Sequence, residues 1–262
     1  MYCTRYRLFS TVSLSALFLS SAAYGLPQGG AVAAGNATIA GTGASAIVTQ
    51  GSGRAVIDWR SFDVGVGEAV TFKQPSAASV TLNRIHDQKP SEILGRISAN
   101  GQVILANPNG MLFGKNSRID VAGLVATTAN IGADAFMREA VLAFGSGGNP
   151  DAAIINKGTI MAKDAGLVAL VAPTVENTGT VTAKMGRVQL AGASSFSLDL
   201  YGDGLVGFGV GEAVLGVGVG NDLEARAGGG ELLAQGLDLL AADHRVRGAG
   251  HHQDAGLYAS LG

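Results

Sequence analysis

Twenty Asp and Glu side chains give this sequence its main capacity for acid–base chemistry. A hydrolase that cleaves glycosidic bonds needs two carboxyl groups held together, with one protonated and the other ionised. The candidates fall on expected turns and strand ends without a shared spacing: Asp58, Asp63, Glu68, Asp87, Glu92 and Asp120. This scatter does not predict a paired catalytic site, and we expect that the protein is not an enzyme.

Metal and dinucleotide sites are no better supported. The histidines show no metal-ligand spacing with a cysteine or a carboxylate: His86, His244, His251 and His252. Gly202, Gly204 and Gly207 match the spacing of a dinucleotide-binding loop, but such a loop must open a helix. Alternating glycines follow here instead, so the sequence predicts neither a metal site nor a cofactor.

The sharpest local motif is a turn with the sequence ANPNGM at residues 106–111. Proline fixes φ at one step of such a turn, and the Asn-Gly pair accepts positive φ. The asparagine amides can also bond to nearby backbone groups. The motif predicts either a rigid structural corner or a signal displayed to a partner, and composition alone does not choose between the two.

The elements that surround this turn repeat about every twenty-one residues. The segment 156–163 aligns with 177–184 at an offset of 21. The second half of the repeat aligns at an offset of 20, and its members are Gly166, Val168 and Leu170 against Gly186, Val188 and Leu190. A third copy, with a shorter turn, contains Gly95, Ile97, Ala99, Gly101, Val103 and Leu105.

Each copy alternates apolar and variable residues with period two, which is typical of strands that turn one face inward. One strand pair cannot bury that face alone, but stacked copies bury it, and each buried Val, Ile or Leu contributes about 1.5–3 kcal/mol. The pattern therefore predicts an all-β fold built as a solenoid of parallel strands, a parallel β-helix.

Other segments fit further strands of the same fold. The segments 36–48 and 116–127 predict additional coils, and the segments 55–59 and 69–72 predict strands around a glycine turn. Trp59 and Phe62 are expected in the core or its cap, because aromatic side chains usually serve packing. The segment 134–144 predicts either a helix capped by Asp134 and ended by Gly145, or a projecting strand pair.

The first residues have the three parts of a secretory signal peptide. Arg5 and Arg7 precede an apolar run from Leu8 to Leu19, and small residues follow at 20–23. The run of twelve is shorter than the ~20 residues of a membrane span. We expect export of the chain and cleavage after Ala23 or Gly25.

Composition agrees with an exported β-protein. Forty glycines, 15% charged residues and 6% aromatic residues are typical of strands and turns. Removal of residues 1–25 takes away two of 18 basic residues, so 16 remain against 20 acids, a net charge of −4. Nucleic acid is therefore not an expected partner. The single cysteine, Cys3, lies in the leader, so no disulfide would hinder passage through a narrow pore.

Several motifs in series give a resemblance to a known family. The sequence LNRI at 82–85 and the run at 93–128 resemble the haemagglutination-activity, or two-partner secretion, domain of filamentous haemagglutinins and high-molecular-weight adhesins. The opening at 29–63 and the sequence IINKGTI at 154–160 extend the resemblance. It covers about residues 26–200, which we expect to form the domain.

The resemblance implies a right-handed β-helix that an outer-membrane barrel transporter with POTRA domains recognises. The family's secretion signature maps onto Asn107, Pro108, Asn109, Gly110 and Met111, with Met in place of Ile. The companion NPNL motif of some members is missing. Asn83 and Arg84 lie in its region, and together with Asn100 and Gly101 they are the family-matching turn and coil residues.

The implied function is that of an adhesin-type exoprotein, secreted or held at the cell surface after passage through the periplasm. Its partners would be the general export machinery, the transporter and a host-cell or bacterial-surface receptor. The alternatives are the secretion domain of a truncated cytolysin or contact-dependent toxin, and a polysaccharide-active β-helix enzyme. A groove with clustered Asp, Lys and Arg would favour the enzyme. Residues 201–262 are expected to form a glycine-rich continuation and a disordered tail.

Overall fold

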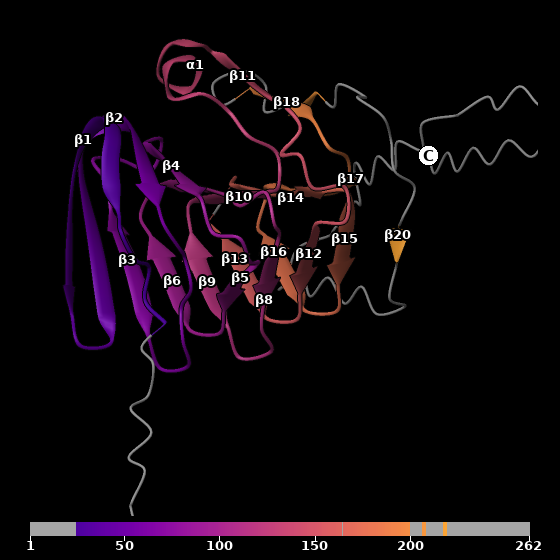
Figure 1. The fold of residues 1–262 in the computed structure, drawn as a ribbon, viewed down its shortest axis with the longest axis horizontal. Coiled ribbons are helices and arrows are strands. Elements are labelled where there is room, and N and C mark those ends of the chain that lie inside the picture. Colours follow the sequence, from indigo (N-terminus) through magenta and orange to yellow (C-terminus); the bar gives the residue numbers. More distant parts are fainter. Residues whose placement is uncertain (1–24, 164, 200–205, 208–216, 219–262) are drawn as a thin grey trace, which may run out of the picture.

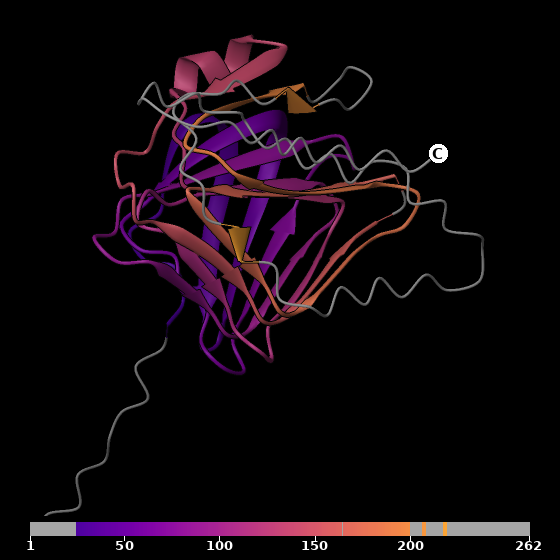
Figure 2. The same cartoon turned by 90° about the vertical axis from the view of Figure 1, so that its right-hand side faces the viewer.

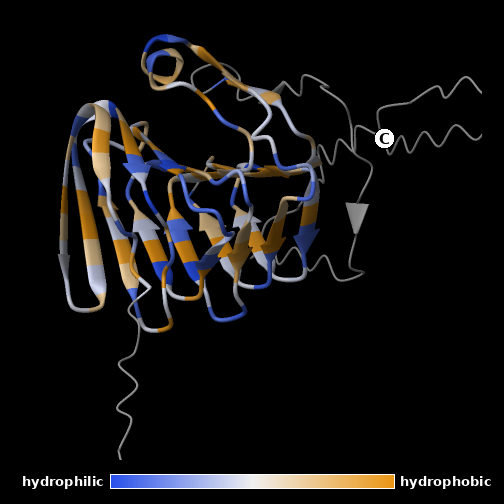
Figure 3. Ribbon diagram, viewed as in Figure 1, coloured by the Kyte–Doolittle hydropathy of each residue, from blue (hydrophilic) through white to orange (hydrophobic). Residues whose placement is uncertain are grey.

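The computed structural model describes residues 25–163, 165–199, 206–207 and 217–218. Within these residues the chain winds into the expected right-handed parallel β-helix, whose three faces give the triangular outline of Figure 2. The leader with Cys3, most of the glycine alternation and the tail lie outside the described residues. Figure 3 shows the predicted alternation of apolar and polar residues along the strands.

Three columns of parallel strands form the faces of the β-helix. The first face contains β3 (Ala69–Lys73), β6 (Arg96–Ala99), β9 (Arg118–Val121), β13 (Thr159–Ala162) and β16 (Thr180–Ala183). The second contains β4 (Val80–Ile85), β7 (Gln102–Ala106), β10 (Gly123–Thr127), β14 (Leu167–Ala172) and β17 (Arg187–Gly192). The third contains β5 (Ser91–Ile93), β8 (Met111–Phe113), β12 (Ala153–Asn156), β15 (Thr174–Asn177) and β20 (Val217–Gly218).

The long strand β2 (Ser45–Trp59) joins two of these faces. Its first part pairs with β3 and its last part pairs with β4, both in parallel. The preceding strand β1 (Ala31–Thr42) pairs with β2 antiparallel. The interpretation of 36–48 as a coil was therefore wrong, because Gly43, with φ +57°, turns the chain straight back as a hairpin.

Apolar side chains stack in register inside the coils. On the first face the pairing aligns Val70, Ile97, Ile119, Ile160 and Val181, and all but the last are fully buried. Of these positions, Ile97, Ile160 and Val181 are the ones that the repeat predicted to face inward. Trp59 and Phe62 join this core with ring centroids 5.4 Å apart, as expected of packing aromatics.

A second apolar layer covers the outer side of the second face. It contains α1 (Ala133–Arg138), β11 (Val141–Phe144), β18 (Phe196–Asp199) and β19 (Val206–Gly207), which lie above the coils in Figures 1 and 2. The Phe144 and Phe196 rings stack at 4.5 Å. Ile104 and Val125, which point outward from the coils, are buried beneath this layer.

The segment 134–144 combines both predicted alternatives. Its first half is the helix α1, and its second half is the strand β11, which pairs antiparallel with β18. The expected cap was wrong: Gly132 occupies the N-cap position and no side chain caps the helix. Asp134 lies in the first turn instead and pairs with Arg138 at 3.2 Å. The helix ends at Arg138, with Glu139 as its C-cap, and not at Gly145 as expected, because residues 141–144 form β11.

The repeated glycines lie where one coil touches the next. A Cβ on Gly179 would overlap the backbone of Gly158, and a Cβ on Gly186 would overlap that of Gly166. These pairs are the positions aligned by the sequence repeat. The glycines therefore permit close backbone approach between stacked turns, a requirement that no other residue meets without shifting a coil.

We predict that Gly179→Ala lowers the free energy of unfolding by about 1–3 kcal/mol, because the added methyl group overpacks two adjoining backbones. Gly145→Ala is the matched control, since a Cβ there has no neighbour within 4 Å. Urea unfolding followed by circular dichroism measures both variants. Equal free energies of unfolding for Gly179→Ala and Gly145→Ala would show that the stacked turns can accommodate a methyl group.

Candidate functional site

The Asn-Pro-Asn-Gly motif forms a tight corner between β7 and β8. The Gly110 amide donates to the carbonyl of Asn107 at 2.9 Å, which closes the turn. Gly110 has φ +100°, and a Cβ there would overlap the carbonyl oxygen of Ala153. The turn is thus held both by its own hydrogen bond and by the coil beside it.

Asn107 is fully buried, and its side chain links its own turn to the neighbouring segment 89–91. Its Nδ2 donates to the carbonyl of Lys89 at 3.1 Å and to Ser91 Oγ at 3.0 Å. Its Oδ1 accepts from the Asn109 amide at 2.9 Å. A buried polar side chain with all these partners supports the interpretation of the motif as a structural corner.

Asn109 extends the corner to both neighbouring coils. Its Nδ2 donates to the carbonyl of Asp87 at 2.7 Å, and its Oδ1 accepts from Asn149 Nδ2 at 3.3 Å. Asn109 and Pro108 are half-exposed, whereas Gly110 and Met111 are buried. In the folded coil, only the tip of the predicted signature faces solvent.

Asn83 and Arg84 lie side by side on β4 but serve opposite surfaces. Asn83 is fully buried, accepts from Trp59 Nε1 at 3.0 Å and donates to the carbonyl of Ile104 at 3.2 Å. Arg84 points outward and makes two bonds to Asp58, at 2.7 and 2.8 Å. Asn83 therefore hydrogen-bonds within the core, and Arg84 forms an ion pair on the outer surface.

Asp58 is the centre of a small surface charge network. His86 Nε2 also contacts its Oδ1, at 3.2 Å. Partial burial opposes ionisation of Asp58, but the hydrogen bonds and charges of Arg84 and His86 outweigh it, so the pKa of Asp58 is lowered. This carboxylate is accordingly held ionised by its partners.

Asn100 and Gly101 form the remaining part of the predicted set, at a corner between β6 and β7. The Asn100 amide group bonds reciprocally to the backbone of Gln74, with both distances 2.7 Å. The Gly101 amide donates to Gln74 Oε1 at 3.0 Å. These hydrogen bonds connect two neighbouring coils. Asn100 and Gly101 lie at a different corner from the Asn-Pro-Asn-Gly turn.

A groove of about 760 Å³ runs over the outer side of the third face, next to the Asn-Pro-Asn-Gly turn. Half-exposed Leu112 and Ile155 lie in it. Its charged lining residues are Asp63, Asp87, Lys89, Glu92 and Asp151. The expectation that the carboxylates are scattered was wrong for three of them, because winding of the coil brings distant positions together. Asp63 and Asp87 are 24 residues apart and Asp87 and Glu92 are 5 apart, so their spacing does not follow the repeat and gave no signal of the group.

The charges in this groove act on one another. Burial raises the pKa of Asp63, and a hydrogen bond from the Glu92 amide, at 2.8 Å, opposes the rise. The negative charges of Asp87 and Glu92 raise it further, and Lys89 lowers it. The groove therefore has an excess of negative charge.

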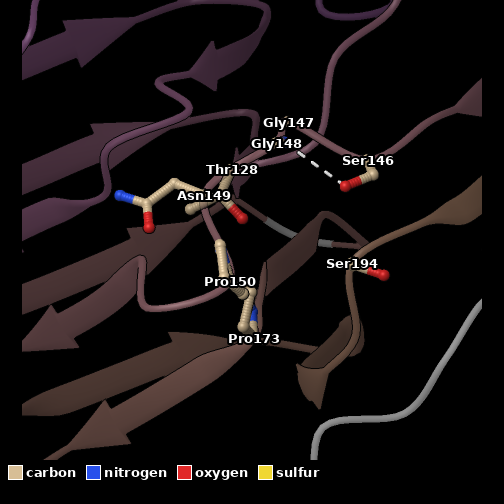
Figure 4. A pocket seen from close by; sticks show the side chains of 8 residues that line it. All are labelled: Thr128, Ser146, Gly147, Gly148, Asn149, Pro150, Pro173 and Ser194. Carbon is tan, nitrogen blue, oxygen red and sulfur yellow. Dashed lines mark hydrogen bonds between the residues drawn. The ribbon is translucent and has the colours of Figure 1, made fainter.

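A second, smaller pocket of about 160 Å³ lies on the other side of the corner. Figure 4 shows its lining, which consists of Thr128, Ser146, Gly147, Gly148, Asn149, Pro150, Pro173 and Ser194. None of these side chains titrates near neutral pH. The lining of the pocket therefore has no group for acid–base catalysis. Asn149 connects the pocket to the Asn-Pro-Asn-Gly turn through its hydrogen bond to Asn109.

In the described part of the chain, no group of three or more His, Cys, Asp or Glu side chains is placed to hold a metal ion. None of the helices in these residues is long and apolar enough to cross a membrane.

Comparison with known proteins gives consistent matches. A family model described as "TPS secretion domain" matches residues 23–226. The crystal structure of the HMW1 secretion domain from Haemophilus influenzae superposes with a TM-score of 0.61 at 26% identity, covering 72% of this chain and 50% of that one.

Curated relatives of the sequence are much longer than this chain. A heme/hemopexin-binding protein of Haemophilus influenzae is 36% identical over 189 residues, which is 67% of this chain and 20% of the relative. A second protein of that name and genus is 43% identical over 117 residues, which is 43% of this chain and 13% of the relative. The chain thus spans a fifth or less of the length of these relatives.

The Asp58 network predicts a pH dependence of stability. A carboxyl group whose pKa is lowered by folding stabilises the fold above its unfolded pKa, about 3.9, and loses that contribution as pH falls through the folded value. Wild type should therefore exceed Asp58→Asn in stability at pH 7, and the difference should shrink below pH 4. Urea unfolding from pH 7 to pH 3, with Asp120→Asn as an exposed control, measures it. A constant difference across this range would contradict the network.

Proposed function

The chain belongs to the TPS secretion domain family, and from this premise we propose that it is an exported exoprotein of a two-partner secretion system. A signal peptide would direct it through the general export machinery to the periplasm. A cognate outer-membrane transporter with POTRA domains would then carry it to the cell surface or the medium. The family match over residues 23–226 is the observation that supports this proposal most directly.

The burial of Asn107 limits the stage at which the transporter could contact the signature. Asn107 is 0% exposed and bonded on both sides of its amide. A transporter can contact that side chain only before the coil closes around it. We therefore place recognition of Asn107 to Met111 in the unfolded chain, and the structural role of the same residues after export.

Folding on the far side of the membrane would then help to retain the exported chain. Each added coil buries apolar residues such as Ile119 and Ile160 and pairs its backbone with the previous coil. The chain that has crossed would be kept from sliding back by the free energy of that burial. This mechanism needs no catalytic residue.

Adhesion to a host-cell or bacterial-surface receptor is the output we propose for the exported protein. A second candidate comes from the relatives, whose names describe heme or hemopexin binding. Absorption titration of the purified chain with heme, and pull-down with hemopexin, separate this candidate from adhesion to cells. Binding of neither ligand, together with attachment to cells, supports the adhesin.

We predict that Asn107→Ala combined with Asn109→Ala abolishes most export in a Gram-negative host that also expresses the cognate outer-membrane transporter. The reason is loss of the signature that the unfolded chain presents. Blotting of medium, cell surface and periplasm measures the distribution. Wild type without the transporter should accumulate in the periplasm.

Gly179→Ala separates recognition from folding in the same experiment, because it strains the coil but leaves the signature intact. If Gly179→Ala is exported and the double asparagine variant is not, recognition of the signature is supported. If export of both variants falls equally, the effect is due to folding alone. Equal export of wild type with and without the transporter would refute two-partner secretion.

A further inference from the structure

The outer side of the third face carries a row of cross-strand neighbours that differs from an ordinary solvated face. Strand pairing places Glu92 beside Leu112, Leu112 beside Ile155, and Ile155 beside Glu176. The bridge between Val64 and Ile93 adds Asp63 at the β5 end of the row. Acids thus lie at both ends and apolar side chains lie in the middle.

The apolar centre of this row has no packing role in either buried cluster. Leu112 and Ile155 are half-exposed and belong to neither the inner core nor the layer over the second face. The extra elements α1, β11 and β18 cover the second face instead (Figures 1 and 2). A sheet face turned to water normally alternates to polar residues at such positions.

Four of the five positions in this row, Asp63, Glu92, Leu112 and Ile155, line a groove, and Glu176 continues the row beyond that lining. The hollow has a volume of about 760 Å³, within the range of about 300–1,000 Å³ of ligand pockets. One wall contains Asp87, Lys89, Pro90 and Asp151, and Leu94 forms part of the other. The groove therefore surrounds its apolar centre with charged residues of mainly one sign.

The negative charge of the groove lacks compensation from ion pairs. Among the described residues, no ion pair includes a groove carboxylate, whereas Arg84 and His86 pair with Asp58 and Arg138 pairs with Asp134. Four acids face the single Lys89 in the lining. Electrostatic complementarity favours a cationic occupant.

We propose that this groove docks an extended peptide segment of a partner protein, with aliphatic side chains in its middle and Lys or Arg at both ends. Five neighbouring positions, from Asp63 to Glu176, span four strand spacings, or about 19 Å. Six extended residues cover about the same length. The aliphatic residues would lie on Leu112 and Ile155, and the cationic ends would lie over the acids at either end of the row. The proposal needs only the folded coil and is independent of the transporter.

The test uses the purified full chain and a fluorescein-labelled peptide of sequence KKLVKK, followed by fluorescence anisotropy at 50 mM and 300 mM salt. We expect saturable binding that weakens at the higher salt, and no binding of the matched peptide EELVEE. Asp63→Asn combined with Glu92→Gln should weaken binding of KKLVKK at least tenfold. Absence of KKLVKK binding at 50 mM salt would overturn the proposal.

Asp120→Asn combined with Glu139→Gln is the matched control, because it removes the same charge from exposed positions outside the groove. This variant should bind the peptide as wild type does. An equal loss in the control and groove variants would show attraction to net charge alone, and would refute a built site.

Ile155→Lys provides an independent variant, since it places a cation on the half-exposed groove floor. It should abolish binding while the circular dichroism melt stays that of wild type, even if the double carboxylate variant folds poorly. Retained binding in Ile155→Lys would overturn the proposal. The proposal would also be overturned if KKLVKK does not bind while the wild-type groove binds an oligosaccharide saturably, or releases reducing sugar from it, and the groove variants lose that activity.

Discussion

Hydrogen bonding between parallel strands of successive coils is the constraint from which the rest of this structure follows. The strands of adjacent coils are held at about 4.8 Å, and the turns that join them must approach each other equally closely. Gly158 and Gly179, or Gly166 and Gly186, make that approach possible. The same spacing buries Asn107 at a corner and Asn83 on β4, where each must bond to the neighbouring backbone.

The three faces of the coil have different surroundings although one repeat builds them all. The inner sides share a single core in which Ile97, Ile119 and Ile160 stack in register. The outer side of the second face is sealed by α1, β11 and β18. The outer side of the third face remains open and combines apolar residues with excess negative charge. The proposed peptide docking therefore lies on the third face.

Much of the fold could be predicted because the repeat reports directly on stacking. The glycines, the inward apolar positions and the corner at residues 106–111 all lie where the period indicated. The groove could not be predicted, because Leu112 and Ile155 are separated by about twice the period. An excursion containing α1 and β11 interrupts the repeat between them. The hairpin of β1 and β2 was missed because an antiparallel pair and a coil share the same alternation of residues.

The pairing of β11 with β18 also changes how the β-helix can come apart. In a simple solenoid each repeat contacts only its neighbours, so unravelling can proceed one repeat at a time. Here β11, which precedes β12 in the chain, pairs with β18, which follows β17. The coils formed by β12 to β17 therefore lie between two strands that are hydrogen-bonded to each other. Mechanical pulling on either end of this segment should release those coils together, in one large extension step, rather than as a series of equal small ones.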